Sequence, residues 1–266
     1  MKKLLWIPAL AVIALIVTSL PVMAVAPVDN PGKGPVDKIV FIHYPQHEAG
    51  KPSSGAGGTG VLCPDYKYSG VHWANPTAIN YYVNPTGSGV GDETAIAAIK
   101  ASFVTWDNAD GPLGYSYQGI STANGGVKDN LNVVSWADIS KQYPGAIAVT
   151  SIWYYRNSKV ITEVDTQMNI GSGFVWSYTS PDTIHDLATK AAADATRYTD
   201  PSNNGIAETY DIQNIMTHEA GHWIMLNDLY NGKDSALTMY GYGSTGELKK
   251  DTLGYGDELG VELAYR

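Results

Sequence analysis

Cysteine is nearly absent from this chain, which has Cys63 alone among its 266 residues. An intrachain disulfide is therefore excluded, and the fold must be stabilised by packing or by a bound metal ion. Charge is also scarce, because only 16% of the residues are charged and the formal net charge is -9. No basic cluster follows the first three residues, so we do not expect a nucleic-acid partner.

The N-terminus has the order of features that is typical of a secretory signal peptide. A basic start, Met1–Lys3, precedes an almost wholly apolar run, Leu4–Leu20, and small residues follow. We expect residues 1–24 to be removed. The alternative is an uncleaved anchor, because the run nearly reaches the roughly 20 residues that a spanning helix needs. In both cases the rest of the chain is expected outside the cytoplasm, either secreted or anchored there.

The whole chain is 44% apolar, which is enough to form a sizeable core. Residues 25–65 are predicted to be a short N-terminal segment and linker. They contain one strand, Lys38–Ile42, and the glycine- and serine-rich stretch Lys51–Gly60. Residues 66–266 are predicted to form one domain.

Hydrophobic periodicity predicts the elements of this domain. Strands are expected over 78–83, 115–117, 131–136, 146–155 and 160–168, and helices over 92–106, 182–196, 211–226 and 257–265. The first helix carries apolar residues at three- and four-residue spacing, from Ile96 to Trp106. Because most strands come first and most helices last, the order favours an α+β fold.

Residues 218–222 read His-Glu-Ala-Gly-His on the helix predicted over 211–226. His218 and His222 are four residues apart, so both imidazoles lie on one face and can reach one zinc ion. Glu219 is turned about 100° around the helix, beside the metal. It could take a proton from a water molecule that the metal acidifies. The H-E-x-x-H pattern therefore predicts a zinc site with Glu219 as general base.

A third ligand is expected at Asp228, six residues beyond His222. Two histidines and a carboxylate leave a fourth position open, as catalytic zinc requires. Two alternatives remain: Asp228 could simply be solvated in a turn, or the ligand could be a downstream glutamate such as Glu247. We expect one catalytic zinc ion, while Ca²⁺ is not indicated.

The segment HEAGHWIMLND, residues 218–228, resembles the extended metzincin motif with Asp in the last position. Met239 falls where metzincins carry a methionine turn beneath the zinc. The segment 257–261, DELGV, is similar to the start of the matrixin C-terminal helix, and 211–214 to the start of the matrixin active-site helix. The resemblance extends from about residue 70 to the C-terminus and implies a matrixin-like zinc peptidase.

This resemblance implies a metzincin-like catalytic domain over residues 66–266. The expected fold is a twisted, mostly parallel sheet with an antiparallel edge strand, a long helix, an active-site helix and a C-terminal helix. Strand 146–155 would be the edge strand, along which an extended peptide would pair. The glycine of the family motif is Met225 here. Asn227 is the residue that we expect to adopt the left-handed conformation instead.

Cys63 precedes Pro64 and Asp65, a pair like the one beside the inhibitory cysteine of matrixin propeptides. The resemblance makes residues 25–65 a pro-like segment and Cys63 a candidate inhibitory thiol. The alternative is an inert, partly buried thiol.

The sequence thus predicts a monomeric, secreted zinc endopeptidase that acts on protein or peptide substrates. A membrane would be a partner only if the N-terminal apolar run stays uncleaved. The alternative function is a catalytically inactive zinc-binding or adhesion domain at the cell surface.

Overall fold

The computed structural model describes residues 34–46, 62–179 and 205–266. The signal-peptide run, the linker 51–60 and the helix expected over 182–196 lie outside the described residues. Within the described ranges, no helix is both long enough and apolar enough to cross a bilayer.

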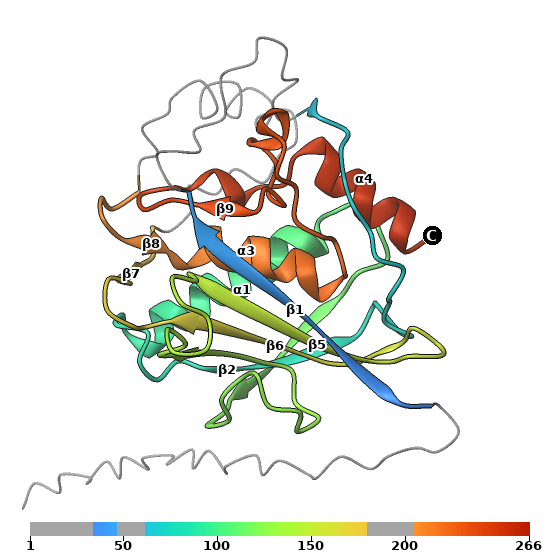
Figure 1. Cartoon of the computed structure of the whole chain (residues 1–266), viewed down its shortest axis with the longest axis horizontal. Coiled ribbons are helices and arrows are strands. Elements are labelled where there is room, and N and C mark those ends of the chain that lie inside the picture. Colours follow the sequence, from blue (N-terminus) through green and yellow to red (C-terminus); the bar gives the residue numbers. More distant parts are fainter. Residues whose placement is uncertain (1–33, 47–61, 180–204) are drawn as a thin grey trace, which may run out of the picture.

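A seven-stranded, mostly parallel sheet forms the centre of the molecule, in the order β3-β2-β4-β6-β5-β1-β9 (Figure 1). The strands are β1 (Val36–Pro45), β2 (Ile79–Asn84), β3 (Tyr115–Ile120), β4 (Val133–Ala137), β5 (Ala148–Tyr155), β6 (Ile161–Asn169) and β9 (Tyr242–Gly243). A separate pair consists of β7 (Trp176–Ser177) and β8 (Tyr210–Asp211). Each of the six strands expected from the sequence is present, within a few residues of its predicted bounds.

The antiparallel strand expected from the sequence is β5, which pairs antiparallel with β6. Its expected place at the edge is wrong. The N-terminal strand β1 pairs antiparallel with β5 from Val36–Tyr155 to His43–Ala148, and β9 lies beyond β1. The short apolar run at 38–42 marked a strand, but its partner is more than 100 residues away. No local pattern specifies such a pairing.

Three α-helices in the described residues complete this mixed fold, which is compatible with the α+β class. They are α1 (Asp92–Asp107), α3 (Ile212–Trp223) and α4 (Tyr255–Ala264). α1 buries Ala95, Ile99, Phe103 and Trp106 at three- and four-residue spacing, as its periodicity predicts. Helix and strand residues share one large core, while a small cluster on the other face contains Ile139, Ala146 and Val149.

Helix α3 lies against α1, and two polar contacts fix their relative position. The indole N–H of Trp106 donates to the carbonyl oxygen of Thr217 at 2.7 Å. The hydroxyl of Ser102 lies 3.2 Å from the carbonyl oxygen of Gln213. Both donors are buried, so the register of α3 on the core is set by directional bonds as well as by apolar packing.

We expect Trp106→Phe to lower the free energy of unfolding by about 1–3 kcal/mol more than Trp136→Phe does. The first change removes the donor to a buried carbonyl. The indole nitrogen of Trp136 is buried and has no hydrogen-bond acceptor among the described residues, so the second change removes no bond seen there. Urea unfolding of the two variants measures the difference. Equal losses would mean that the Trp106 bond does not hold α3.

Candidate metal centre

All twelve residues of α3 are buried, and the helix carries the predicted H-E-x-x-H pattern. The side chain of Asp211 caps its N-terminus, where Oδ1 accepts from the amide of Asn214 at 3.0 Å. A cap of this kind satisfies an amide that the helix itself cannot. It also fixes where the helix begins.

The helix ends at Trp223, three residues before its predicted end, in a Schellman turn. The amide of Leu226 donates to Gly221 O at 3.0 Å, and the amide of Met225 donates to His222 O at 2.8 Å. This turn reverses the chain so that Asp228 comes back beside the helix.

Met225 takes the left-handed position of this turn, with φ 65°. The expectation that Asn227 would do so is wrong, because Asn227 is absent from the described residues with positive φ. The side chain of Met225 is completely buried. Its burial outweighs the roughly 1–2 kcal/mol that the left-handed conformation costs a residue with a Cβ atom.

The turn brings three potential ligand atoms together. Asp228 Oδ1 lies 3.1 Å from His218 Nε2 and 3.5 Å from His222 Nε2. Apart from one another, these three buried atoms have no hydrogen-bond partner among the described residues. Atoms that each bind one zinc ion at about 2.0–2.1 Å with tetrahedral angles would be about 3.3 Å apart. The spacing and the missing hydrogen bonds both fit a common ion, and this grouping could hold a metal.

The Nδ1 atom of each histidine makes a hydrogen bond that determines the tautomer of the neutral ring. A metal ligand needs the tautomer in which the other nitrogen, Nε2, carries no hydrogen. His218 Nδ1 lies 2.7 Å from the carbonyl oxygen of Thr238, and His222 Nδ1 lies 2.7 Å from that of Leu226. A carbonyl oxygen only accepts, so each Nδ1 carries the hydrogen. In the neutral form of each ring, Nε2 then keeps a free lone pair on the side of Asp228.

Burial and neighbouring charges shift the pKa values of these three side chains in different directions. Burial, together with the ammonium group of Lys250, lowers the pKa of His218 to about 3. Burial also opposes charge on His222, but the Asp228 carboxylate outweighs it and raises that pKa. The pKa of Asp228 is lowered, because the histidine contacts outweigh its own burial. The carboxylate thus stays ionised in a buried place, as a metal ligand must.

Met239 packs against α3 at Gly221. A Cβ atom at Gly221 would lie 2.2 Å from Met239 Sδ, so only glycine allows this contact. The Met239 side chain is 2% exposed.

Asp257 holds the turn that contains Met239, a role that sequence reasoning missed. Its carboxylate accepts from the amides of Thr238 at 2.8 Å and Met239 at 3.1 Å. Because Thr238 O receives the His218 ring, Asp257 orients that ligand through one intermediate residue. The motif 257–261 marked this position, but only the structure reveals the contact.

Glu219 lies beside this grouping. Its Oε2 accepts from the Thr150 hydroxyl at 2.6 Å, and its Oε1 lies 3.2 Å from His43 Nδ1. Burial raises the pKa of Glu219 to about 7. The carboxylate is therefore held at two points and poised between its charged and neutral forms near neutral pH.

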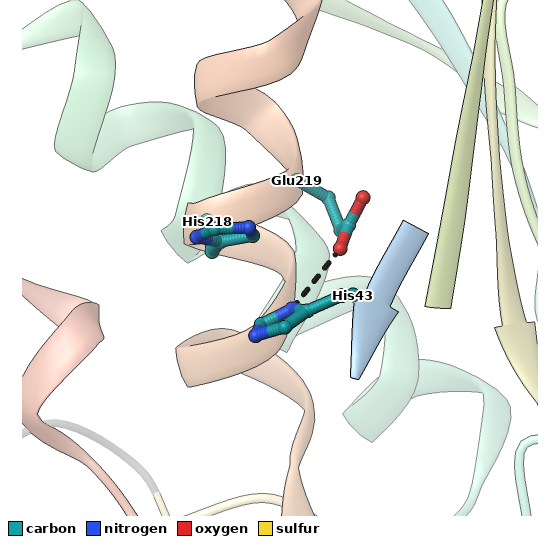
Figure 2. Close-up of side chains that lie close together, drawn as sticks. All are labelled: His43, His218 and Glu219. Atoms are coloured by element: carbon teal, nitrogen blue, oxygen red, sulfur yellow. Dashed lines mark hydrogen bonds and ion pairs between the residues drawn. The ribbon is translucent and has the colours of Figure 1, made fainter. Parts of the chain in front are cut away.

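His43 comes from β1 and was not anticipated from the sequence. Figure 2 shows its ring between β1 and α3, pointing toward Glu219 and lying close to His218. The ring centroids of His43 and His218 are 4.0 Å apart. On its other side, His43 Nε2 lies 3.1 Å from the buried Nζ of Lys250. A lone histidine in a predicted strand gives no local signal of such a position.

Cys63 and Glu247, the two other candidate residues, lie outside the grouping of His218, His222 and Asp228. Cys63 Sγ donates to Asp234 Oδ1 at 3.3 Å and belongs to a separate grouping with Asp65, so its inhibitory role stays a prediction. Glu247 is buried and lies 3.5 Å from Lys249 Nζ. It is not in the grouping with His218 and His222, whereas Asp228 is.

Comparison of the sequence with models of known protein families and with curated proteins finds no match. The site is therefore interpreted from its own chemistry.

We expect Asp228→Ala to lower the affinity for Zn²⁺ more than roughly 100-fold. Loss of a residue that only hydrogen-bonds to a ligand lowers metal affinity less than this. Glu247→Ala should leave the affinity within about threefold. Competition titrations with a fluorescent chelator measure both. The reverse ranking would make Glu247 the third ligand.

We expect Met225→Gly to lower the free energy of unfolding by about 1–3 kcal/mol, because the cavity outweighs the relief of strain. Lys159 also has positive φ, at 60°, but is exposed. Lys159→Gly should therefore gain up to about 1 kcal/mol. Urea unfolding measures both changes, and a more stable Met225→Gly would show that strain dominates at the turn.

Proposed function

We propose that this chain is a secreted, matrixin-like zinc endopeptidase that hydrolyses peptide bonds in protein or peptide substrates. The observation that carries the proposal is the convergence of His218 Nε2, His222 Nε2 and Asp228 Oδ1 beside the Glu219 carboxylate. Each ligand type suits Zn²⁺, and a neutral ring with its hydrogen on Nδ1 offers the free Nε2 lone pair that metal binding requires.

The number of ligands favours a catalytic rather than a structural ion. A closed structural zinc site needs four protein ligands, and the grouping supplies three. When bound there, Zn²⁺ would polarise the scissile carbonyl and acidify the attacking water.

The chain's own residues would handle the proton. Glu219 takes a proton from the attacking water and later gives it to the leaving amine. A pKa raised by burial to about 7 suits a group that must both accept and donate near neutral pH. A bound cation would pull this pKa down and favour the base form. Thr150 holds the carboxylate in place through its 2.6 Å hydrogen bond.

The rival function is an inactive zinc-binding domain. It has the same ligands, so only turnover separates the two functions. Casein zymography of the purified chain, with and without a chelator, makes this distinction. Hydrolysis that the chelator abolishes supports the peptidase, whereas zinc binding without hydrolysis supports the rival.

We expect Glu219→Ala to lower kcat at least about 100-fold and to leave Zn²⁺ bound, because the base is lost but the ligands remain. Glu258→Ala, a half-buried carboxylate on α4, is the matched control and should keep its activity. Metal analysis and peptide hydrolysis are measured on the same samples. Substantial activity in Glu219→Ala would rule out this mechanism.

A further inference from the structure

The strand β1 lies where the proposed peptidase would need its substrate. An extended peptide would pair antiparallel with the sheet strand beside the site, which is β5. In the structure, β1 already makes this pairing over eight consecutive residue pairs. Figure 1 shows β1 running alongside β5 and across α3. The main-chain groups that a peptide would use on β5 are thus taken by the chain's own N-terminal segment.

Two side chains of β1 cover the metal ligands. The rings of Phe41 and His222 stack with centroids 4.0 Å apart and an interplanar angle of 3°. Two residues further, the His43 ring lies over His218, with centroids also 4.0 Å apart. Alternate residues of a strand point to the same face, so one face of β1 supplies both contacts.

His43 also contacts Glu219, the proposed general base. Its Nδ1 lies 3.2 Å from Glu219 Oε1, where the attacking water would need an acceptor. The ring is completely buried, and Lys250 Nζ contacts both His43 Nε2 and the carbonyl oxygen of Tyr240. His218 and His222 are also completely buried. A catalytic ion needs an open position for substrate, and β1 closes that side of the site.

The opposite face of β1 has its own apolar contacts. Val40, Ile42 and Tyr44 pack against the cluster of Ile139, Ala146 and Val149. Most of β1 is nevertheless only half-buried, and His43 is the one fully buried residue among Val36–Pro45. The strand therefore lies on the surface of the sheet with a single deep anchor, as a bound peptide would.

We propose that Val36–Pro45 is a self-bound, substrate-like strand that keeps the peptidase inactive until it is displaced. The inference rests on the proposed function. It also predicts that a substrate peptide places an aromatic side chain against His222, as Phe41 does. Self-inhibition follows because His43 holds Glu219 and the strand excludes other peptides from the groove.

The competing interpretation makes β1 a permanent structural strand, and the two predict opposite effects of weakening it. We expect the full-length double variant Phe41→Ala/His43→Ala, loaded with Zn²⁺, to hydrolyse casein about tenfold faster than the parent chain or more. The open fraction of molecules should rise by that factor. Val164→Ala, which truncates a side chain buried in β6, controls for general destabilisation and should not activate.

A second readout does not depend on turnover. A fluorescein-labelled peptide of residues 36–45, VDKIVFIHYP, is titrated with each protein in the presence of chelator, and polarisation is recorded. The double variant should bind it at least about tenfold more tightly than the parent chain, whose groove is filled. The same peptide with alanine at the positions of Phe41 and His43 should bind neither protein well.

The outcomes separate the two proposals. Peptide binding to the double variant without any hydrolysis by the zinc-loaded protein would refute the peptidase but keep the self-bound strand. Hydrolysis by the parent chain, with an equally or less active double variant and no peptide binding, would overturn the self-bound strand and keep the peptidase.

Discussion

The structure depends on the convergence of two imidazole nitrogens and one carboxylate oxygen in a place that excludes water. Three buried polar atoms without hydrogen bonds would cost several kcal/mol if they stayed unpaired. The surrounding residues nevertheless fix each of them firmly, because both rings are held at Nδ1 by carbonyl oxygens. Three such atoms close to one point form a grouping that could hold a cation.

That geometry reaches well beyond the H-E-x-x-H helix. The carbonyl that holds His218 belongs to Thr238, whose amide is held in turn by Asp257 on α4. Gly221 lets Met239 pack directly beneath the helix. Asp257 on α4 therefore supports the proposed metal site without supplying a ligand, and a change at Asp257 would reach His218 through the turn that contains Met239.

The sequence was most informative where the determining interactions are local. The four-residue spacing of His218 and His222 specifies a shared helix face, and the α1 periodicity specifies its buried side. Asp228 was predicted as a ligand, but the turn that delivers it was not, because burial of Met225 overrides its poor fit to positive φ. Local propensity cannot reveal that balance.

The contacts that escaped prediction join distant segments. His43 contacts Glu219, which is 176 positions away in the sequence, and Lys250, which is 207 positions away. The displacement of β5 from the edge of the sheet has the same origin. Strand patterns identified 38–42 as a strand, but pairing is decided by the whole fold rather than by the segment. The pairing of β1 with β5 covers the site, and no sequence motif predicts this pairing.

The central claim is most directly tested by X-ray absorption at the zinc edge on the zinc-loaded, full-length protein. The account predicts one ion with only nitrogen and oxygen neighbours, at about 2.0–2.2 Å, and with the outer-shell scattering of imidazole rings. A sulfur neighbour at about 2.3 Å, or a folded protein that retains no zinc, would contradict it.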